Sequence, residues 1–402
     1  MTHAYRDCLG SPHAKYLFTT NLLGRLPNGM APLGIAIFLR SHHFGFGTVG
    51  LLTALYGLST AVGGPLLGRA VDRFGQPAVL APSALGSAAG LLWLTASGGR
   101  SAAAAAGAVC VAGLFSPPLE PCLRTLWPSM LADPRAIAAA FALDASLQEV
   151  VFVSGPLLVV LTSAVLSPGA VLPLTALAML VGTAGYLLPE PVRRWRAEPR
   201  RPDWAGPLRS SVLRRLLLTL GCIGIGLGAL NIAMVAYQEH VGRPGLSGVL
   251  LGANALGALI GGLVYGARSW PLPVPRRLVL LLAASAVCYL PLVVDAPPLP
   301  TTVLVFCAGL FLAPILTCGF SIIGEVAPRG TATEAFAWMV TAVLTGNAAG
   351  SSLAGLTRQQ VDLWAVLLIP GLAMLVATLA ATTVGRGPTV PTDTASLEVM
   401  NR

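Results

Sequence analysis

Apolar residues dominate twelve stretches of the chain, and short polar segments separate most of them. Each stretch has about 20 residues or more, the length that an α-helix needs to cross roughly 30 Å of hydrocarbon. The stretches occupy residues 15–39, 47–70, 77–98, 101–127, 136–165, 168–189, 212–238, 246–267, 275–295, 300–324, 331–356 and 362–385. The pattern predicts an all-α integral membrane protein with twelve transmembrane helices.

The longest interruption of the apolar pattern lies in the middle of the chain, at residues 189–211. Prolines, tryptophans and six arginines replace the apolar run there. We interpret this segment as a linker between two halves. The predicted domains are an N-terminal six-helix bundle at 1–190, a cytoplasmic linker at 191–211 and a C-terminal six-helix bundle at 212–402.

The two halves resemble each other at an offset of 195 to 198 residues. The peptide AGLFSPPLEPC at 112–122 matches AGLFLAPILTC at 308–318 in six of eleven positions. An offset of six helices preserves direction across the membrane, so the halves are predicted to be parallel repeats about an axis along the membrane normal. Two further matches support the repeat: Gly50, Gly63, Gly64 and Gly68 recur as Gly248, Gly261, Gly262 and Gly266, and Ala140-Phe141-Ala142 recurs at 335–337.

The composition agrees with a membrane protein. Hydrophobic residues make up 55% of the chain, charged residues only 10%, and the mean hydropathy is +0.76. Soluble proteins usually have about 25% charged residues. The 24 arginines and single lysine suggest a GC-rich bacterium, so the expected location is the bacterial cytoplasmic (inner) membrane.

The distribution of basic residues predicts the orientation. With both termini cytoplasmic, that side holds 20 of the 25 Lys and Arg residues, as the positive-inside rule requires. Arg25 is the one arginine then assigned to the membrane interior. The net charge of +9 describes a basic rim beside anionic membrane lipid rather than a nucleic-acid-binding surface.

The connection between the second and third stretches reads GRAVDRFGQ and contains Gly68, Asp72, Arg73 and Gly75. It resembles the G-x-x-x-D-R-x-G signature of the major facilitator superfamily. With the twelve stretches, the repeat and the basic linker, the resemblance covers the whole chain. The chain departs from the family pattern just after the motif, where Gln76-Pro77 replaces the usual basic residues. The resemblance implies an alternating-access transporter whose loop acid faces the eleventh helix at a cytoplasmic gate.

The eleventh stretch offers a suitable partner for this acid. Thr331 and Glu334 have the spacing of a capping box. The unpaired amides and the dipole of a helix beginning there attract an anion such as Asp72. We also expect Arg73 to reach Glu334. An ordinary turn with a solvated ion pair is the alternative.

Charged residues inside the membrane carry the functional argument. A mid-bilayer arginine costs roughly 2.5–3.5 kcal/mol, so Arg25 is expected to be paired and to face the protein interior. Asn21 and Asn28 extend the same polar stripe along its helix. The stripe is expected to line a wet cavity.

Three acids lie at comparable depths. Glu120, Asp144 and Glu149 are about 10, 12 and 20 Å from the cytoplasmic side, against about 15 Å for Arg25. A carboxylate near a buried cation can exchange a proton for a conformational change, so these residues are candidates for proton coupling. Glu149 is favoured slightly, because its neighbours Gly155-Pro156 resemble a fragment of an antiporter signature. A purely structural salt-bridge cluster is the alternative.

Other residue patterns narrow the function. The chain has no phosphate-binding loop, no H-E-x-x-H motif, and seven cysteines without C-x-x-C spacing, so no enzyme, cofactor or metal site is expected. Uncharged polar residues of the second half lie on helices whose family counterparts border the cavity, although many can equally pack helices. With Asn21 and Asn28, the candidate cavity residues are Asn231, Tyr237, Asn254, Trp338 and Asn347.

These features together predict a proton-coupled transporter that works as a monomeric twelve-helix chain. Export of a small amphiphilic drug or metabolite by proton antiport is the leading hypothesis. The alternatives are proton-coupled uptake of a sugar, amino acid or organic anion, and a membrane receptor or scaffold with a transporter fold.

Overall fold

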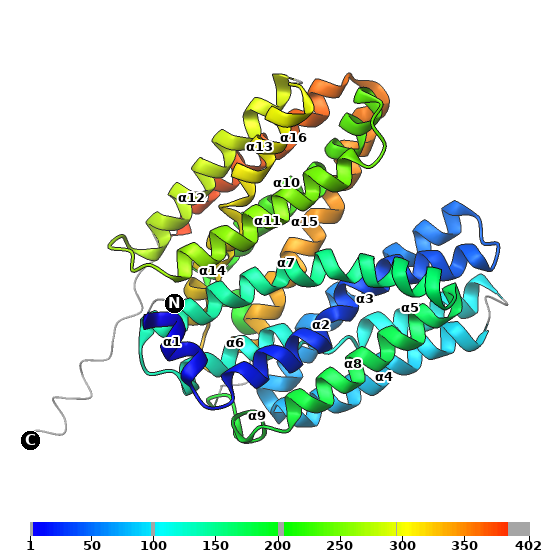
Figure 1. The fold of residues 1–402 in the computed structure, drawn as a ribbon. Helices are drawn as coiled ribbons and strands as arrows, with labels where there is room; N and C mark the ends of the chain where they lie inside the picture. Colours follow the sequence, from blue (N-terminus) through cyan, green and yellow to red (C-terminus); the bar gives the residue numbers. More distant parts are fainter. Residues whose placement is uncertain (1–2, 98–100, 200–204, 295, 385–402) are drawn as a thin grey trace, which may run out of the picture.

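The structure, a computed structural model, describes residues 3–97, 101–199, 205–294 and 296–384. Every regular element in these ranges is a helix, as predicted (Figure 1). Residues 200–204 of the predicted linker and residues 385–402 of the predicted second half lie outside the described residues. Eight helices precede the linker: α1 His3–Gly10, α2 Ala14–Ser41, α3 Phe46–Phe74, α4 Gln76–Ser97, α5 Ala102–Leu114, α6 Leu119–Met130, α7 Pro134–Val165 and α8 Val171–Leu187.

The linker contains the short helix α9 Glu190–Arg194 and the 3-10 turn η2 Gly206–Arg209. Further 3-10 turns, η1 Pro168–Ala170 and η3 Leu290–Val294, extend two of the long helices. The second half consists of α10 Ser211–Val241, α11 Leu246–Gly266, α12 Val274–Tyr289, α13 Pro298–Gly309, α14 Leu312–Val326, α15 Ala332–Gln360 and α16 Leu363–Ala381.

The fourth and tenth predicted stretches are each broken into two helices at the same point of the repeat. Pro117 and Pro118 lie between α5 and α6, whereas Leu310 and Phe311 lie between α13 and α14. A proline lacks an N–H group and disfavours helical geometry in the residue before it, which explains the first break. In the second half Pro314, the repeat equivalent of Pro118, lies in the first turn of α14 and lacks the N–H that would bond to the carbonyl oxygen of Leu310 in a continuous helix.

Each break lies beside a glycine of a neighbouring helix. The carbonyl oxygen of Leu114 contacts Gly63 of α3, and that of Leu310 contacts Gly261 of α11, so closely that an added Cβ would collide with it. Small residues of this kind let helices in membranes approach closely. The same packing in both halves gives the internal repeat a structural counterpart.

Eleven of the predicted stretches are long and apolar enough to cross a membrane, counted over the described residues. The exception is α15, which has 29 residues and is long enough, but carries many polar side chains. It packs along α10 within its own half and along α3 of the other half. Protein contacts on both sides let this helix carry polar residues that a lipid-facing helix could not.

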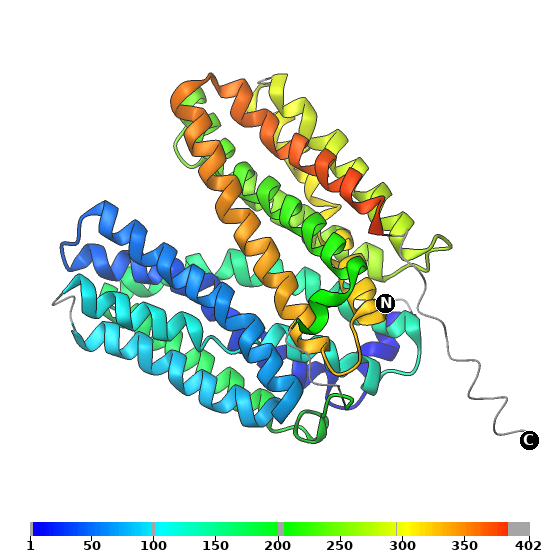
Figure 2. The same ribbon diagram turned by 180° about the vertical axis from the view of Figure 1, so that it is seen from behind.

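The helices form two bundles that meet at one end (Figures 1 and 2). Helices α2–α8 form the first bundle and α10–α16 the second, and α3–α15, α7–α11 and α7–α14 are the main contacts between them. We call the end with residues 131–133, 188–199 and 327–331 the linker end. The end with residues 42–45, 242–245 and 361–362 is the far end, toward which the bundles diverge.

Hydrogen bonds across the interface follow the repeat. Thr341 of α15 donates from Oγ1 to the carbonyl oxygen of Ala61 at 2.8 Å. Ser146 of α7 donates from Oγ to the carbonyl oxygen of Leu259 at 3.5 Å. These pairs occupy equivalent positions in the two halves, so the interface has approximate twofold symmetry.

The glycines of α3 and α11 show where this interface ends. Gly50, Gly57 and Gly64 share one face of α3, because seven residues make about two turns. A Cβ added to Gly64 would lie 3.9 Å from Thr341, whereas one added to Gly50 or Gly57 meets no atom within 4 Å. Gly248 of α11 has the same open surroundings. The interface is therefore closed at the linker end and open at the far end.

Candidate functional site

Four charged side chains form a buried cluster inside the first bundle: Arg25 of α2, Glu120 and Arg124 of α6, and Asp144 of α7, called the charge cluster below. Asp144 accepts from both arginines, at 2.5 Å from Nη1 of Arg25 and 2.8 Å from Nε of Arg124. Glu120 lies 3.4 Å from Nη2 of Arg25 and also pairs with Arg124. Two cations and two anions balance, which reduces the cost of placing charges there.

Local sequence explains how the charge cluster is assembled. Pro118 precedes α6, so Glu120 lies in the first turn of that helix, where the dipole favours an acid. Arg124 follows Glu120 at i+4, which places both side chains on one face. Asn21 donates to the carbonyl oxygen of Leu119 at 2.8 Å and is 3.4 Å from Nη1 of Arg25, so α2 is attached to α6 at this point.

Arg124 is the member of the charge cluster that sequence reasoning missed. It was counted with the basic cytoplasmic rim, but its side chain is only 1% exposed. The sequence did contain a sign that Arg124 pairs with Glu120. The two residues are spaced i, i+4 on a helix that begins after Pro117 and Pro118. Arg25 and Arg124 are therefore both buried within the first bundle.

Arg124 also contacts the second bundle. Its guanidinium carbon lies 3.6 Å from the ring centre of Phe320 on α14 and 5.9 Å from that of Phe336 on α15. Phe141 of α7 packs against both rings, with centroids 6.0 and 6.2 Å away. A cation over an aromatic face is attracted by the ring quadrupole, more strongly where water is excluded. The charge cluster is thus in contact with the interface between the bundles.

Glu149 lies outside the charge cluster, although a position near Arg25 was expected. Positions 144 and 148 share one face of α7 at i, i+4, and Gln148 is the residue that accepts from Arg25. Residue 149 is rotated by about 100° from residue 148. Glu149 is half-buried and follows Ser146 at i+3, and Ser146 bonds to α11, so both lie on the face of α7 toward the second bundle. Neither an ion pair nor a hydrogen bond of its carboxyl group is found among the described residues.

The motif between α3 and α4 lies at the linker end. The carboxylate of Asp72 accepts from the backbone amides of Thr333 at 3.1 Å and Glu334 at 2.9 Å, so it caps α15 across the interface. Gly68 lies against the backbone of α15, where an added Cβ would be 3.1 Å from the Cα of Glu334. Gly75 has a positive φ of 86°, which allows the sharp turn into α4.

Two predicted details of this contact are wrong. Thr331 precedes α15 but makes no side-chain capping bond, and its hydroxyl donates to Pro328 instead. Asp72 occupies the amides that a capping box would have used. Glu334 pairs with Arg69, at 2.6 Å and 3.1 Å, rather than with Arg73. Arg73 is exposed beside the ring of Phe74.

Three of the seven predicted cavity residues form hydrogen bonds within their own bundles. Asn21 is held within the first bundle, as described above. Tyr237 donates to the carbonyl oxygen of Ala296 at 2.6 Å, and Asn254 donates to Tyr289 and Val305, both at 2.9 Å, so these two stabilise the second bundle. The remaining candidates are more accessible: Asn28 and Asn231 are exposed, and Trp338 and Asn347 are half-buried.

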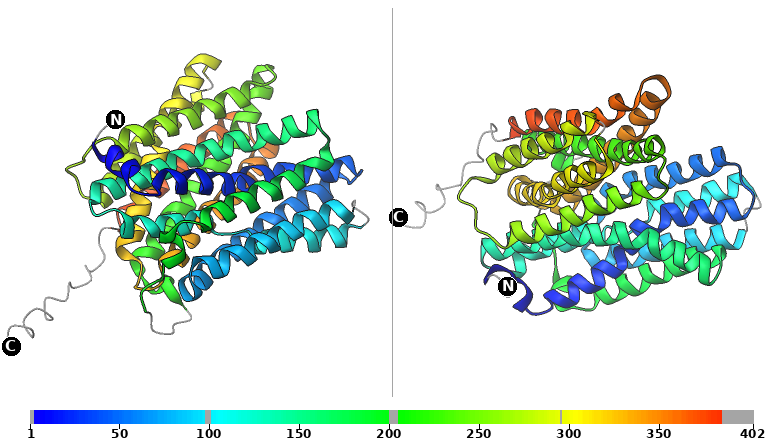
Figure 3. Two further views of the ribbon diagram at one scale, coloured as in Figure 1. Left: turned by 60° about the horizontal axis from the view of Figure 1, so that its bottom comes forward. Right: turned by 45° about the horizontal axis from the view of Figure 1, so that its top comes forward.

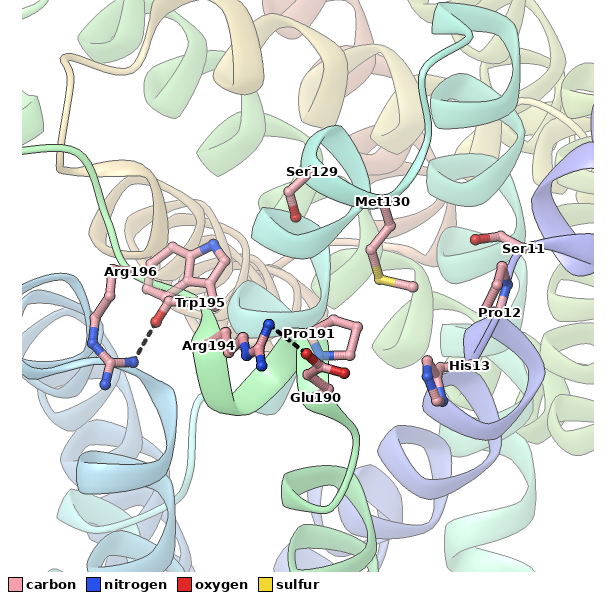
Figure 4. Close-up of a pocket in the computed structure, with 10 residues that line it drawn as sticks. All are labelled: Ser11, Pro12, His13, Ser129, Met130, Glu190, Pro191, Arg194, Trp195 and Arg196. Atoms are coloured by element: carbon pink, nitrogen blue, oxygen red, sulfur yellow. Dashed lines mark hydrogen bonds and ion pairs between the residues drawn. The ribbon is translucent and has the colours of Figure 1, made fainter.

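A cavity of about 590 Å³ lies at the linker end, away from all of these residues (Figure 4). The α1–α2 connection, the end of α6 and the start of the linker surround it. Glu190 and Arg194, which line the cavity, form an ion pair at 2.6 Å. Within the described parts of the chain, no group of three or more His, Cys, Asp or Glu side chains is placed to bind a metal ion.

Solved structures share this fold. The human organic anion transporter MFSD10 (TETRAN) has a TM-score of 0.73 at 16% identity, covering 95% of this chain and 100% of that one. A bacterial homologue of the iron transporter ferroportin in an outward-facing state has a TM-score of 0.73 at 17% identity, covering 93% and 99%. A variant of the Escherichia coli fucose:proton symporter FucP has a TM-score of 0.66 at 14% identity, covering 92% and 98%.

Comparison of sequences identifies the family. A search of curated proteins gave no match. The sequence model of the Major Facilitator Superfamily matches residues 17–298, which is well over half of the 402 residues. The motif at Asp72, the two repeated bundles and the structural matches agree with this result. The chain therefore belongs to the Major Facilitator Superfamily and is a secondary transporter, not an enzyme.

Proposed function

We propose that this transporter is driven by protons and exports a small amphiphilic molecule by proton antiport. The observation that carries the proposal is the position of Glu149. Its carboxyl group lies about 22 Å along α7 from the linker end, near mid-membrane depth. It faces the second bundle and has no counter-charge among the described residues. A carboxyl group in such surroundings is stabilised by taking up a proton.

The charge cluster has a different part in this proposal. Asp144 and Glu120 are each contacted by both arginines. A carboxylate between two guanidiniums is stabilised in its charged form. We infer that these ion pairs persist during the cycle and hold α2, α6 and α7 together. The exchangeable proton is then assigned to Glu149, and the structural role to the charge cluster.

The orientation is part of the proposal. Placing the linker end in the cytoplasm puts most basic residues on that side, in agreement with the positive-inside rule. The conformation with a closed linker end and an open far end is then an outward-open state. In this state Glu149 can exchange protons with the outside, and alternating access delivers them to the cytoplasm.

Export rather than uptake is supported by Gly155-Pro156, which resembles a fragment of an antiporter signature. This pair follows Glu149 by about two turns of α7. The walls that the substrate meets are assigned to the accessible candidates Asn28, Asn231, Trp338 and Asn347. An indole and three amides surrounded by apolar helices suit an amphiphilic molecule with few charges.

The test uses purified protein in liposomes with an internal pH indicator and a panel of amphiphilic cations, sugars and organic anions. Antiport is expected to move protons against the direction of substrate movement, whereas symport moves both in one direction. Glu149→Gln keeps the shape and removes the titratable group, so proton movement should cease while substrate binding continues. Glu239→Gln changes an exposed carboxyl group on α10 and serves as the control.

Three results would count against the proposal. Proton movement in the same direction as the substrate would replace export by uptake. Wild-type proton coupling in Glu149→Gln would move the proton site elsewhere. Substrate-dependent electrical current without any pH change would exclude protons as the coupling ion.

A further inference from the structure

The interface at the linker end is symmetric in its backbone but not in its chemistry. On the α3–α15 side, Asp72 caps α15 in the other half. The repeat places Trp270 where a second such acid would stand. Trp270 stacks on Tyr265 at 5.2 Å and donates to the carbonyl oxygen of that residue, both within the second bundle. At the position equivalent to Asp72, the α11–α7 side therefore has a tryptophan instead of an acid.

Helix α7 also has no need of such a cap. Asp133 accepts from the amide of Arg135 at 2.8 Å, so the first turn of α7 is capped within its own half. Pro134 occupies the first helical position and has no amide to offer. An acid from the second half would therefore find few unpaired amides to bind at the start of α7. A different contact joins the two halves at this place.

Helix α1 supplies that contact. It packs on α7 of the first half (Figure 3). Its Tyr5 reaches α11 of the second half. The hydroxyl of Tyr5 donates to the carbonyl oxygen of Leu263 at 3.0 Å and lies 3.4 Å from that of Gly262. The side chain is 7% exposed. Tyr5 thus forms a hydrogen bond between the two halves, although helix α1 lies before the repeated segments.

The glycines of α11 make room for this contact. Gly266 is the repeat equivalent of Gly68, and an added Cβ there would collide with the hydroxyl of Tyr5 and lie 2.6 Å from the Cβ of Ala142. Gly68 admits the backbone of α15, whereas Gly266 admits a tyrosine from α1. Burial raises the pKa of Tyr5 to about 12, so the hydroxyl keeps its proton and remains a donor.

We propose that Tyr5 and helix α1 form a second gate contact, which closes the linker end on the α7–α11 side as Asp72 closes it on the α3–α15 side. This inference rests on the proposed function, because it requires the linker end to open during the cycle. Tyr5 is a positioning residue that stabilises one state of the transporter. Its loss shifts the balance between states and leaves the substrate and proton sites intact.

The test measures the population of each state in the full-length protein. Nitroxide labels are introduced at Arg193 and Arg276 by a chemistry that does not use cysteine, because the chain has seven native cysteines. Both side chains are exposed, and they lie on α9, which packs on the first bundle, and on α12 of the second. Opening of the linker end lengthens the distance between them.

Tyr5→Phe removes only the hydroxyl and leaves the ring. Loss of one hydrogen bond is expected to raise the ratio of open to closed linker ends by about two- to tenfold. Tyr16→Phe, an exposed tyrosine of α2, is the control and should leave the ratio unchanged. Combination with Asp72→Asn should multiply the two ratios, because the contacts lie on different sides of the interface.

The outcomes separate this inference from the proposed function. An altered ratio in Asp72→Asn with an unchanged ratio in Tyr5→Phe would overturn the role of Tyr5 and leave the gate at Asp72 in place. An unchanged ratio in both variants would overturn the gate itself. Unfolding could also change the measured ratio in Tyr5→Phe. Equal melting temperatures of Tyr5→Phe and Tyr16→Phe exclude that explanation.

Discussion

Asp72→Asn is the sharpest test of the gate. The aspartate carboxylate accepts from two amides at the N-terminus of α15, and both bonds join the two bundles. Asparagine retains one acceptor oxygen, but its NH₂ group faces an amide that is itself a donor. The variant therefore loses the negative charge at the helix end and one of two hydrogen bonds.

The magnitude follows from these two losses. A charge at a partly buried helix terminus contributes about 1 kcal/mol, and a hydrogen bond to a charged group contributes about 1.5 kcal/mol or more. Asparagine recovers part of this, so we expect a net loss of about 2 kcal/mol, which corresponds to about a 30-fold change in the equilibrium constant. A state with a closed linker end at about 97% would then become about half populated.

The assay is the distance between labels at Arg193 and Arg276, recorded in liposomes without substrate. Asp133→Asn is a matched control: it makes the same change at the N-terminus of α7, where the cap lies within one half. Asparagine is also a good N-cap, so the control should keep the wild-type distance distribution. A distribution for Asp72→Asn that cannot be distinguished from that of Asp133→Asn would refute the gate assignment.

Two further predictions concern the charge cluster and the topology. Arg124→Lys keeps the charge but cannot bridge Asp144 and Glu120 with a planar fork, and it stacks less well on Phe320, so the open linker-end population should rise about threefold to tenfold (~1 kcal/mol). The exposed Arg135→Lys is the control, and equal label distances in the two variants would remove Arg124 from the gate. A membrane-impermeant reagent applied to whole cells should fail to modify a cysteine placed at Arg193, and modification there would reverse the proposed orientation.

The sequence predicted the helices well because membrane burial imposes a strong compositional signal. Twenty apolar residues in a row have few structures available in lipid other than a spanning helix. The repeat was readable because glycines that admit a neighbouring backbone, such as Gly63 and Gly261, tolerate no larger residue. Helix α1 was missed because its eight residues mix polar and apolar types without an apolar run, and its packing depends on Tyr5 and the buried Cys8.

Side-chain partners were harder to predict than helices. Depth along a helix placed Glu149, Asp144 and Arg25 at similar levels, but rotation about α7 decides which acid meets the arginine. Arg69 and Arg73 are one turn apart, and only the approach angle of α15 determines that Glu334 pairs with Arg69. Such choices depend on how helices cross, which no periodicity within a single helix records.

Helix α7 connects the features on which the proposed cycle depends. Phe141 contacts the aromatic rings of the second bundle, Asp144 belongs to the charge cluster, Ser146 bonds across the interface and Glu149 is the proposed proton site. These residues lie within about 12 Å along one helix. A shift of α7 on protonation of Glu149 would therefore strain the linker-end contacts directly.

Spatial closeness alone does not establish coupling. The decisive quantity is the interaction energy between Glu149→Gln and Asp72→Asn in the label-distance assay. A non-additive double variant is expected if α7 transmits the proton state, whereas additivity would mean that the proton site and the gate act independently.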